Sequence, residues 1–530
     1  MNYFLYNDNL RIDFDRKTEA ITGLLNKSFG WNAIKQPALA LGPELLVPLH
    51  NIRNNRVSTR LLVLSGFQKT NDASAVLSWE GLCSDQGGDL DISLQINVSL
   101  RKSSVVFKPV IHNRTEHVIE EFHFPGLGGL REPENEPPLQ SMAMHLCGGW
   151  TRSPLGDGFP MECGYWGTDY PTFIRSYPGP GMVTPFILLC NERHGVYMGF
   201  HERDINISCF IHEIKPGYKD SYHSRVPGGD MVGNSPAGFC VRAARMPFIQ
   251  PGEKTELAPL VMNLFSGSWR RGIEPYREWR KTWFSSKSQP EWLDKMDSWL
   301  TVHLNSPENR LRYKYADLPD LAREASEYGV RGMQILGWAI GGQDRAEPYQ
   351  DTDPLLGTKE ELKQSIQQIK DMGIRVLLMC KFKWADRTHQ KYREEMESCA
   401  IRDMYGKPVH FEGYGYQTLS QFLSGGSCIT GSGVCHLSEK YRELAVREFH
   451  KILDLEPHGI QYDELSNHII MCFDENHGHK PGECTFKGSV ELSKRFYEAA
   501  NQKDPDFLMA AEGPNDVLSQ YYPVNYIRSW

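Results

Sequence analysis

The sequence of 530 residues lacks the features that mark several common protein classes. No run of about 18 or more apolar residues occurs, so no segment is predicted to cross a membrane as a helix. The opening MNYFLYNDNLRIDF has neither a basic region nor a long apolar one, which predicts no signal peptide and a cytoplasmic location. The net charge is -8 without long charge runs, which argues against nucleic acid as a partner.

Cysteine is present but does not form a recognisable disulfide framework. The 12 cysteines are scattered, and many lie inside apolar runs, as Cys190 does in FILLC and Cys380 in VLLMC. Buried free thiols in a reducing compartment are the simplest interpretation. No GxGxxG motif follows an apolar run, so a dinucleotide-binding sheet is not indicated, and we expect no cofactor.

Two patterns divide the chain. Residues 1–270 contain alternating or apolar runs such as RLLVLSGF and DISLQINVSL, separated by turn signals such as RNNR and DQGG. This pattern predicts an antiparallel β-sandwich. Residues 271–296 are predicted to be a linker helix, in which Tyr276, Trp279 and Trp283 share one face.

Residues 297–530 alternate short apolar runs with amphipathic helical segments. Repeated β-then-α units predict a parallel sheet, and polar or aromatic residues at the strand ends favour a TIM-type (β/α)8 barrel. The sixth predicted strand lies at the end of the chain, whereas a closed barrel needs two more. Either the sequence is a fragment or the barrel is incomplete, and we favour a fragment, which is a barrel truncated after strand six.

The most informative segments are GIQYDELSNH and FLMAAEGPND, in which apolar strands run into carboxylates. Asp463 and Glu464 follow the first strand, and Glu512 ends the second. A carboxylate at the tip of a buried strand is costly to desolvate, so it usually has a function there. Consecutive parallel strands joined by one helix are expected to be neighbours, which brings the two carboxylates together as glycosidic bond hydrolysis requires.

The other predicted strand ends supply acids, bases and indoles that suit a polyhydroxylated ligand. Each of these residues also has a plain structural interpretation, as an N-cap, a loop salt bridge or a core aromatic. We predict the following substrate-binding residues in addition to the pair of acids: Trp338, Asp344, Lys381, Lys383, Trp384, Glu464, His477, His479 and Arg528.

The chain resembles the retaining α-glycosidase superfamily, which includes the α-galactosidases of families 27 and 36 and the family-31 α-glucosidases. NLRIDFDRKTEAITGLLNKSFGWN resembles the opening strands of their galactose-mutarotase-like sandwich, and FSGSWRRGIEPYREW resembles their sandwich-to-barrel linker. The resemblance implies a nucleophilic Asp at the end of strand four, which is Asp463 here. The Lys-Trp-Asp and Ser-Asp-Asn motifs of α-galactosidases are absent, so galactose specificity is not implied.

The position of the proton donor varies among these relatives. Strand five ends here in Glu512, whereas strand six ends in Arg528 and Trp530, so Glu512 is expected to be the donor. In this interpretation Lys381 or Lys383 holds sugar hydroxyls and keeps Asp463 ionised, while Trp338 and Trp384 wall the pocket.

A second cluster lies in IIMCFDENHGHKPGEC, which holds Cys472, Asp474, His477, His479 and Cys484. These residue types suit zinc, but their spacing is not that of a common zinc finger. We expect no metal, and we expect His477 or His479 to face the Asp463 pocket. Nearby, Cys428 and Cys435 are close enough in sequence to pair in an oxidising compartment.

Three functions are consistent with these patterns. The first is a retaining glycoside hydrolase acting on α-glycosides of an oligosaccharide or other glycoside substrate. The second is a non-catalytic carbohydrate-binding protein on the same scaffold. The third is a metal-dependent hydrolase that uses the Cys/His loop. A carboxylate separation of about 5–5.5 Å favours the first function. A wide separation, or one acid held in a buried salt bridge, favours the second, and a metal at the His477 loop favours the third.

Overall fold

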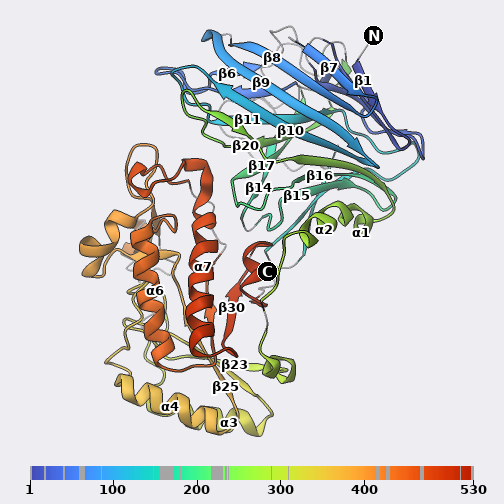
Figure 1. Cartoon of the computed structure of the whole chain (residues 1–530). Coiled ribbons are helices and arrows are strands. Elements are labelled where there is room, and N and C mark those ends of the chain that lie inside the picture. The colour runs from blue at the N-terminus through green and yellow to red at the C-terminus, as the bar shows by residue number, and fades with distance from the viewer. Residues whose placement is uncertain are drawn as a thin grey trace. The chain divides into compact units, whose positions relative to one another are not determined.

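The computed structural model divides into two compact units, Met1–Trp283 and Phe284–Trp530 (Figure 1). It describes residues 3–16, 19–39, 42–58, 66–84, 86–146, 149–155, 172–179, 181–215, 231–232, 235–236, 238–287, 289–307, 310–412, 418–424, 430–465, 471–513 and 515–526. Among these residues, none of the helices is long and apolar enough to cross a membrane.

The first unit consists mainly of one 20-stranded sheet, whose pairings are almost all antiparallel. Its strands are β1 (Tyr3–Tyr6), β2 (Leu10–Phe14), β3 (Ile21–Asn26), β4 (Trp31–Asn32), β5 (Glu44–Leu46), β6 (Arg56–Ser58), β7 (Gly66–Asn71), β8 (Ser74–Ser84), β9 (Gly88–Arg101), β10 (Ser104–Asn113), β11 (Glu121–Gly128), β12 (Gln140–Met144), β13 (Trp150–Pro154), β14 (Thr172–Tyr177), β15 (Phe186–Cys190), β16 (His194–Phe200), β17 (Ser208–Lys215), β20 (Gly238–Arg245), β21 (Lys254–Glu256) and β22 (Leu260–Ser266). A separate hairpin pairs β18 (Met231–Val232) with β19 (Ser235–Pro236), and a 3₁₀ turn spans Pro37–Leu39.

Hydrophobic alternation explains these strands. In β8 and β9, buried residues alternate with less buried ones, because successive side chains of a strand point to opposite faces. The two strands pair with each other, and β9 continues into β10 through a tight turn at Lys102, whose φ is 52°. The predicted β-rich, antiparallel first part is therefore confirmed, while the mutarotase-type sandwich remains a prediction.

The predicted linker helix over residues 271–296 is wrong in its length. The structure has the short helices α1 (Trp269–Gly272) and α2 (Glu274–Lys281), and a 3₁₀ turn follows at Glu291–Lys295. Pro290 immediately precedes that turn, and proline does not fit inside a helix. Helix α2 packs on the first unit, where Tyr276 lies 4.8 Å from the ring of Phe186 and Trp279 stacks on His201.

The second unit is built on a parallel sheet of six strands that follow one another in sequence order. The strands are β23 (Trp299–His303), β24 (Gly332–Leu336), β25 (Arg375–Cys380), β29 (Gly459–Tyr462), β30 (Leu508–Glu512) and β31 (Val524–Tyr526). The helices are α3 (Leu318–Glu327), α4 (Lys359–Asp371), α5 (Leu419–Ser424), α6 (Glu439–Asp454) and α7 (Cys484–Lys503). Short helical turns occupy Tyr315–Asp317, Tyr392–Met396, Glu397–Cys399, Glu475–His477, Pro481–Glu483 and Leu518–Gln520.

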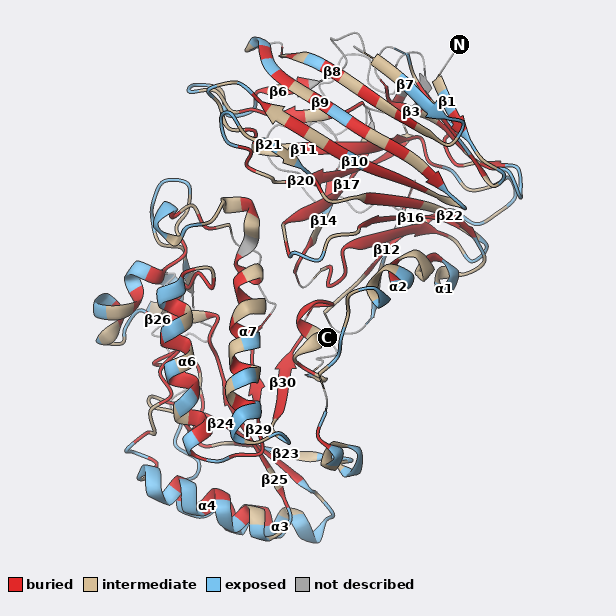
Figure 2. Cartoon of the chain, in the orientation of Figure 1, coloured by how far each residue is buried: buried red, intermediate tan, exposed pale blue. Residues whose placement is uncertain are grey.

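This sequential parallel order is that of a half-barrel and confirms the predicted βα units. Closure into an eight-stranded barrel remains a prediction. Helices α6 and α7 lie side by side, and Phe449 stacks on Phe496 between them with the ring centroids 4.3 Å apart (Figure 1). Strands β29 and β30 are buried along their whole length, as Figure 2 shows for β30, which explains their apolar sequences.

The register between β29 and β30 fixes the level of the carboxylates. Gly459 pairs with Leu508 and Tyr462 with Ala511, so Asp463, one residue further, lies level with Glu512. A Cβ at Gly459 would lie 2.3 Å from the carbonyl oxygen of Leu508, so only glycine allows this close approach.

An excursion between β25 and α6 forms a small antiparallel sheet. It contains β26 (Trp384–Asp386), β27 (His410–Glu412) and β28 (Thr430–Gly433), with β28 in the middle. Strand β26 starts four residues beyond the end of β25, so the small sheet is anchored beside the strand ends.

Candidate functional site

A buried lysine and three carboxylates form the centre of the candidate site. The Nζ atom of Lys381, just after β25, lies 2.9 Å from Oδ2 of Asp463 and 3.2 Å from Oε2 of Glu464. It also forms an ion pair with Asp344, which follows β24. Only 2% of the Lys381 side chain is exposed, so these contacts are made away from bulk water.

The carboxylates determine the protonation state of this lysine. Burial disfavours its charged form, but Asp463, Asp344 and Glu464 outweigh that effect and hold the pKa of Lys381 well above its ordinary value. The ammonium group is therefore fixed as a cation at neutral pH.

Glu512 joins this centre through the backbone. Its Oε2 atom accepts a hydrogen bond of 3.1 Å from the N–H of Glu464. Glu464 has a φ of 58° and Asp344 a φ of 62°, a left-handed conformation that is unfavourable for residues other than glycine. Such backbone strain is found preferentially at functional sites, where the surrounding structure holds it.

Two buried glutamines orient Asp463. The Nε2 group of Gln334, on β24, donates to Oε1 of Gln461 over 3.1 Å, and Nε2 of Gln461 lies 3.4 Å from Oδ1 of Asp463. Gln461 and Asp463 are two residues apart and so point to the same side of the sheet. One Asp463 oxygen thus faces an amide donor and the other faces Lys381.

The predicted indoles have different environments. Trp384 is partly exposed and donates its indole N–H to Oε2 of Glu464 over 3.0 Å. Trp338 is only 1% exposed and donates its indole N–H to the carbonyl of Met379 over 2.8 Å. Trp384 therefore belongs to the carboxylate centre, whereas Trp338 has little surface left for a ligand.

The two predicted lysines contact different residues. Lys381 reaches Asp463, but Nζ of Lys383 lies 3.9 Å from the ring centroid of Phe486 on α7. The prediction named either lysine as the partner of Asp463, and the ion pair identifies Lys381. Arg528 lies outside the described residues.

Glu347, which sequence analysis missed, adds a fifth acid. It lies in the loop after β24 and is only 7% exposed. Burial is the main cause of a pKa raised well above its ordinary value, while Lys381 acts in the opposite direction and Asp344 adds to the rise. Burial therefore favours the protonated form of the Glu347 carboxyl group. The segment GGQDRAEP, which carries two acids after a predicted strand, was the available signal.

The expectation that His477 or His479 faces Asp463 does not match their contacts. His477 contacts the sulfur of Cys472 and the carbonyl of Ser398, and His479 contacts the sulfur of Cys435 and the carbonyl of Lys480. The loop after β29 turns both rings toward these thiols. The side chain of Cys484 and the whole of Cys428 lie outside the described residues.

Solved structures with a similar fold include several glycosidases. The α-N-acetylgalactosaminidase NagBb from Bifidobacterium bifidum, in its GalNAc complex, is 13% identical with a TM-score of 0.67, over 98% of this chain and 78% of that one. An α-galactosidase from Lactobacillus brevis is 11% identical with a TM-score of 0.53, over 100% and 72%. A GH36 α-galactosidase from Geobacillus stearothermophilus, in complex with stachyose, is 12% identical with a TM-score of 0.51, over 100% and 75%. At these identities the likeness shows the fold.

Sequence comparison adds one assignment. The chain matches none of the curated proteins compared. A family model described as "Domain of unknown function (DUF6259)" matches residues 258–527, which is about half of the chain and includes the whole parallel sheet. The chain therefore belongs to the DUF6259 family.

Proposed function

We propose that this protein is a retaining glycoside hydrolase that acts on α-glycosides, with Asp463 as the nucleophile and Glu512 as the acid and base. The observation that carries the proposal is the level placement of Asp463 and Glu512 on neighbouring strands, with Lys381 beside the first. The fold shared with α-galactosidases and an α-N-acetylgalactosaminidase supports the same substrate class. We also propose a mutarotase-like sandwich for residues 1–270 and a barrel for residues 297–530, joined by residues 271–296.

Strand spacing supports the retaining outcome. Neighbouring strands lie about 4.8 Å apart, and side chains at the same level of two parallel strands point to the same face of the sheet. Retaining enzymes need carboxyl groups about 5–5.5 Å apart, whereas inverting enzymes need about 6.5–9.5 Å to admit a water molecule. The register between β29 and β30 fits the shorter separation.

The mechanism follows from the residues present. Lys381 holds Asp463 ionised, and Gln461 orients its other oxygen. The Asp463 carboxylate attacks the anomeric carbon while the bond to the leaving oxygen breaks and Glu512 donates its proton to that oxygen. Glu512 then takes a proton from water, whose oxygen displaces Asp463 and regenerates both groups. Glu347, whose pKa is raised by burial, is the alternative donor.

A screen of the full chain against aryl α- and β-glycosides tests the function. Asp463→Asn should abolish turnover while the protein still folds. Glu512→Gln should slow substrates with poor leaving groups far more than activated aryl glycosides, which need little protonation. The matched control is Asp351→Asn, because that carboxylate is 44% exposed and pairs with Lys451. Full activity of both site variants would refute the assignment.

A non-catalytic carbohydrate-binding protein is the second candidate. The observation that favours it is the buried ion pair of Asp463 with Lys381, since a structural role would suffice for such a pair. Hydrolysis is preferred because a buried cation also keeps a nucleophile ionised. Saturable binding of glycosides by the native chain, without turnover of any of them, would favour this second function.

A further inference from the structure

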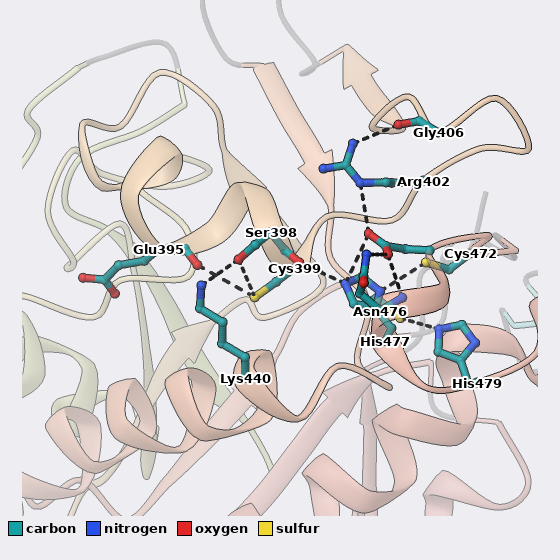
Figure 3. A network of polar contacts seen from close by, with 12 residues as sticks. Glu395, Ser398, Cys399, Arg402, Gly406, Lys440, Cys472, Asn476, His477 and His479 are labelled. Carbon is teal, nitrogen blue, oxygen red and sulfur yellow. Dashed lines mark hydrogen bonds and ion pairs between the residues drawn. The ribbon is translucent and has the colours of Figure 1, made fainter.

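Two cysteines and two histidines meet in a group that shares no residue with the Lys381 centre. Cys435 follows β28, whereas Cys472, His477 and His479 come from the loop between β29 and α7. One ligand atom from each of the four residues lies within 4.8 Å of the other three. Figure 3 shows Cys472, His477 and His479 converging. Two segments that are far apart in the sequence thus contribute to one small group.

Each histidine uses one ring nitrogen for a hydrogen bond to a backbone carbonyl and points its other ring nitrogen at the cysteine sulfurs, as a metal ligand would. Nε2 of His477 lies 3.0 Å from the carbonyl oxygen of Ser398, and Nδ1 of His479 lies 2.9 Å from that of Lys480. A carbonyl only accepts, so these nitrogens carry the protons in the neutral rings. Nδ1 of His477 and Nε2 of His479 then present lone pairs to the sulfurs. Metal-binding histidines typically donate their other N–H to a carbonyl or carboxylate in this way.

The distances match those of a tetrahedral zinc site. Nδ1 of His477 is 3.4 Å from Sγ of Cys472, and Nε2 of His479 is 3.2 Å from Sγ of Cys435. Bonds of about 2.3 Å to sulfur and about 2.0–2.1 Å to nitrogen place a tetrahedral sulfur–nitrogen pair about 3.5 Å apart. Thiolate and imidazole ligands in a tetrahedron are those that zinc prefers.

The surroundings hold this loop in place. Cys435 and Cys472 are buried in one apolar cluster with Ile401. Asp474 accepts a hydrogen bond of 3.0 Å from Nε of Arg402, so the loop is tied to the excursion. Gly478 has a φ of 72°, the left-handed conformation that reverses the chain between the two histidines.

We propose that Cys435, Cys472, His477 and His479 bind one structural Zn²⁺ ion. Four protein ligands complete a tetrahedron and leave no open position, so the ion stabilises the fold and does not activate water. It joins the end of the β26–β28 sheet to the loop that follows the Asp463 strand. Binding requires both thiols to be deprotonated, and their two protons pass to solvent. The site does not depend on the proposed glycosidase activity.

Metal analysis of the full chain, purified after expression with added zinc, tests this proposal. The expected result is one zinc per chain, which is lost in Cys435→Ser and in Cys472→Ser. The control is Cys399→Ser, because Cys399 is buried nearby, contacts the carbonyl of Glu395 and is not one of the four ligands. This variant should retain its zinc.

Cobalt substitution keeps the proposal falsifiable if the serine variants fail to fold. The zinc of the native chain is removed with a chelator and replaced with Co²⁺, which should give the intense visible bands of a tetrahedral site with thiolate ligands. Absence of these bands in the native chain, absence of stoichiometric zinc, or zinc retained by a folded Cys435→Ser variant would each overturn the proposal. In those cases the four residues form two thiol–imidazole hydrogen bonds only.

Discussion

Replacing Lys381 with methionine should destabilise the second unit strongly. The substitution keeps an unbranched side chain that ends at the ε position, but it leaves Asp344, Asp463 and Glu464 without their shared cation. Lys381 is only 2% exposed. Removing one partner of a buried ion pair costs about 3–5 kcal/mol, because the remaining charge stays desolvated. For a unit of this size, about 2–4 °C is lost per kcal/mol, which gives a decrease in Tm of about 6–20 °C.

Thermal unfolding of the full chain, followed by calorimetry, measures this loss. The matched control is Lys363→Met, in which the same substitution removes a 2.7 Å ion pair to Glu456 with side chains 45% and 46% exposed. An exposed pair contributes about 0–1 kcal/mol, so its Tm should barely change. Adding Asp344→Asn to Lys381→Met should recover part of the loss. If Lys381→Met lowers Tm no more than the control does, the buried charge cluster does not stabilise the fold.

The raised pKa of Lys381 makes the stability of the protein depend on pH, and the direction of the change follows from the sign of the shift. The pKa of this lysine in the folded protein is raised well above 10.5, so the folded state keeps a proton that the unfolded state loses first. The stabilisation is therefore complete below about pH 10.5 and is lost as the pH rises through the folded value. The Tm difference between the native protein and Lys381→Met should stay constant from neutral pH to about pH 10 and shrink above it.

Three further substitutions test other parts of the structure. Burial raises the pKa of Glu19 to about 8, so native stability falls between about pH 4.5 and 8, and Glu19→Gln should raise Tm at pH 8 but not at pH 4. An equal effect at both pH values would contradict this. Glu347→Gln should also raise Tm more at high pH than at low pH, because burial raises the pKa of Glu347 as well. Unchanged hydrolysis of unactivated glycosides by this variant would exclude Glu347 as the proton donor. Gly337→Ala should lower the free energy of unfolding by more than about 1–3 kcal/mol, because φ is +62° and the new Cβ would lie 2.0 Å from the carbonyl oxygen of Asn305. The control is Gly373→Ala, where φ is +80° and a new Cβ would meet no atom within 4 Å, so only backbone strain contributes. Chemical denaturation measures the free energy of unfolding of both variants, and equal losses would refute the steric argument.

Local sequence was sufficient to locate the carboxylates of the site. The apolar runs before Asp463 and Glu512 are the strands β29 and β30, because buried parallel strands need continuous apolar sequence. The sequential order of the strands then places both acids at the same edge of the sheet.

The remaining features depend on tertiary contacts. Lys381 and Lys383 are equivalent in sequence, and only the end of β25 at Cys380 determines which of them reaches Asp463. Cys435 joins the Cys/His group through the long excursion after β25, so the sequence indicated neighbouring Cys484 instead. The pKa of Glu347 results from burial, which a hydrophilic loop sequence does not reveal.

The charge of the Lys381 cluster has a consequence for ligand selection. Three carboxylates and one ammonium group have a negative formal net charge when all are ionised. A fixed negative field of this kind favours a sugar ring as it becomes an oxocarbenium ion, and it favours a protonated amine over a neutral hydroxyl of the same shape. A sugar analogue with a ring nitrogen should therefore bind more tightly at a pH below the pKa of that nitrogen than above it. In the proposed hydrolase, Asp344 and Glu464 would contribute to selectivity through their charge, even without contact to the ligand.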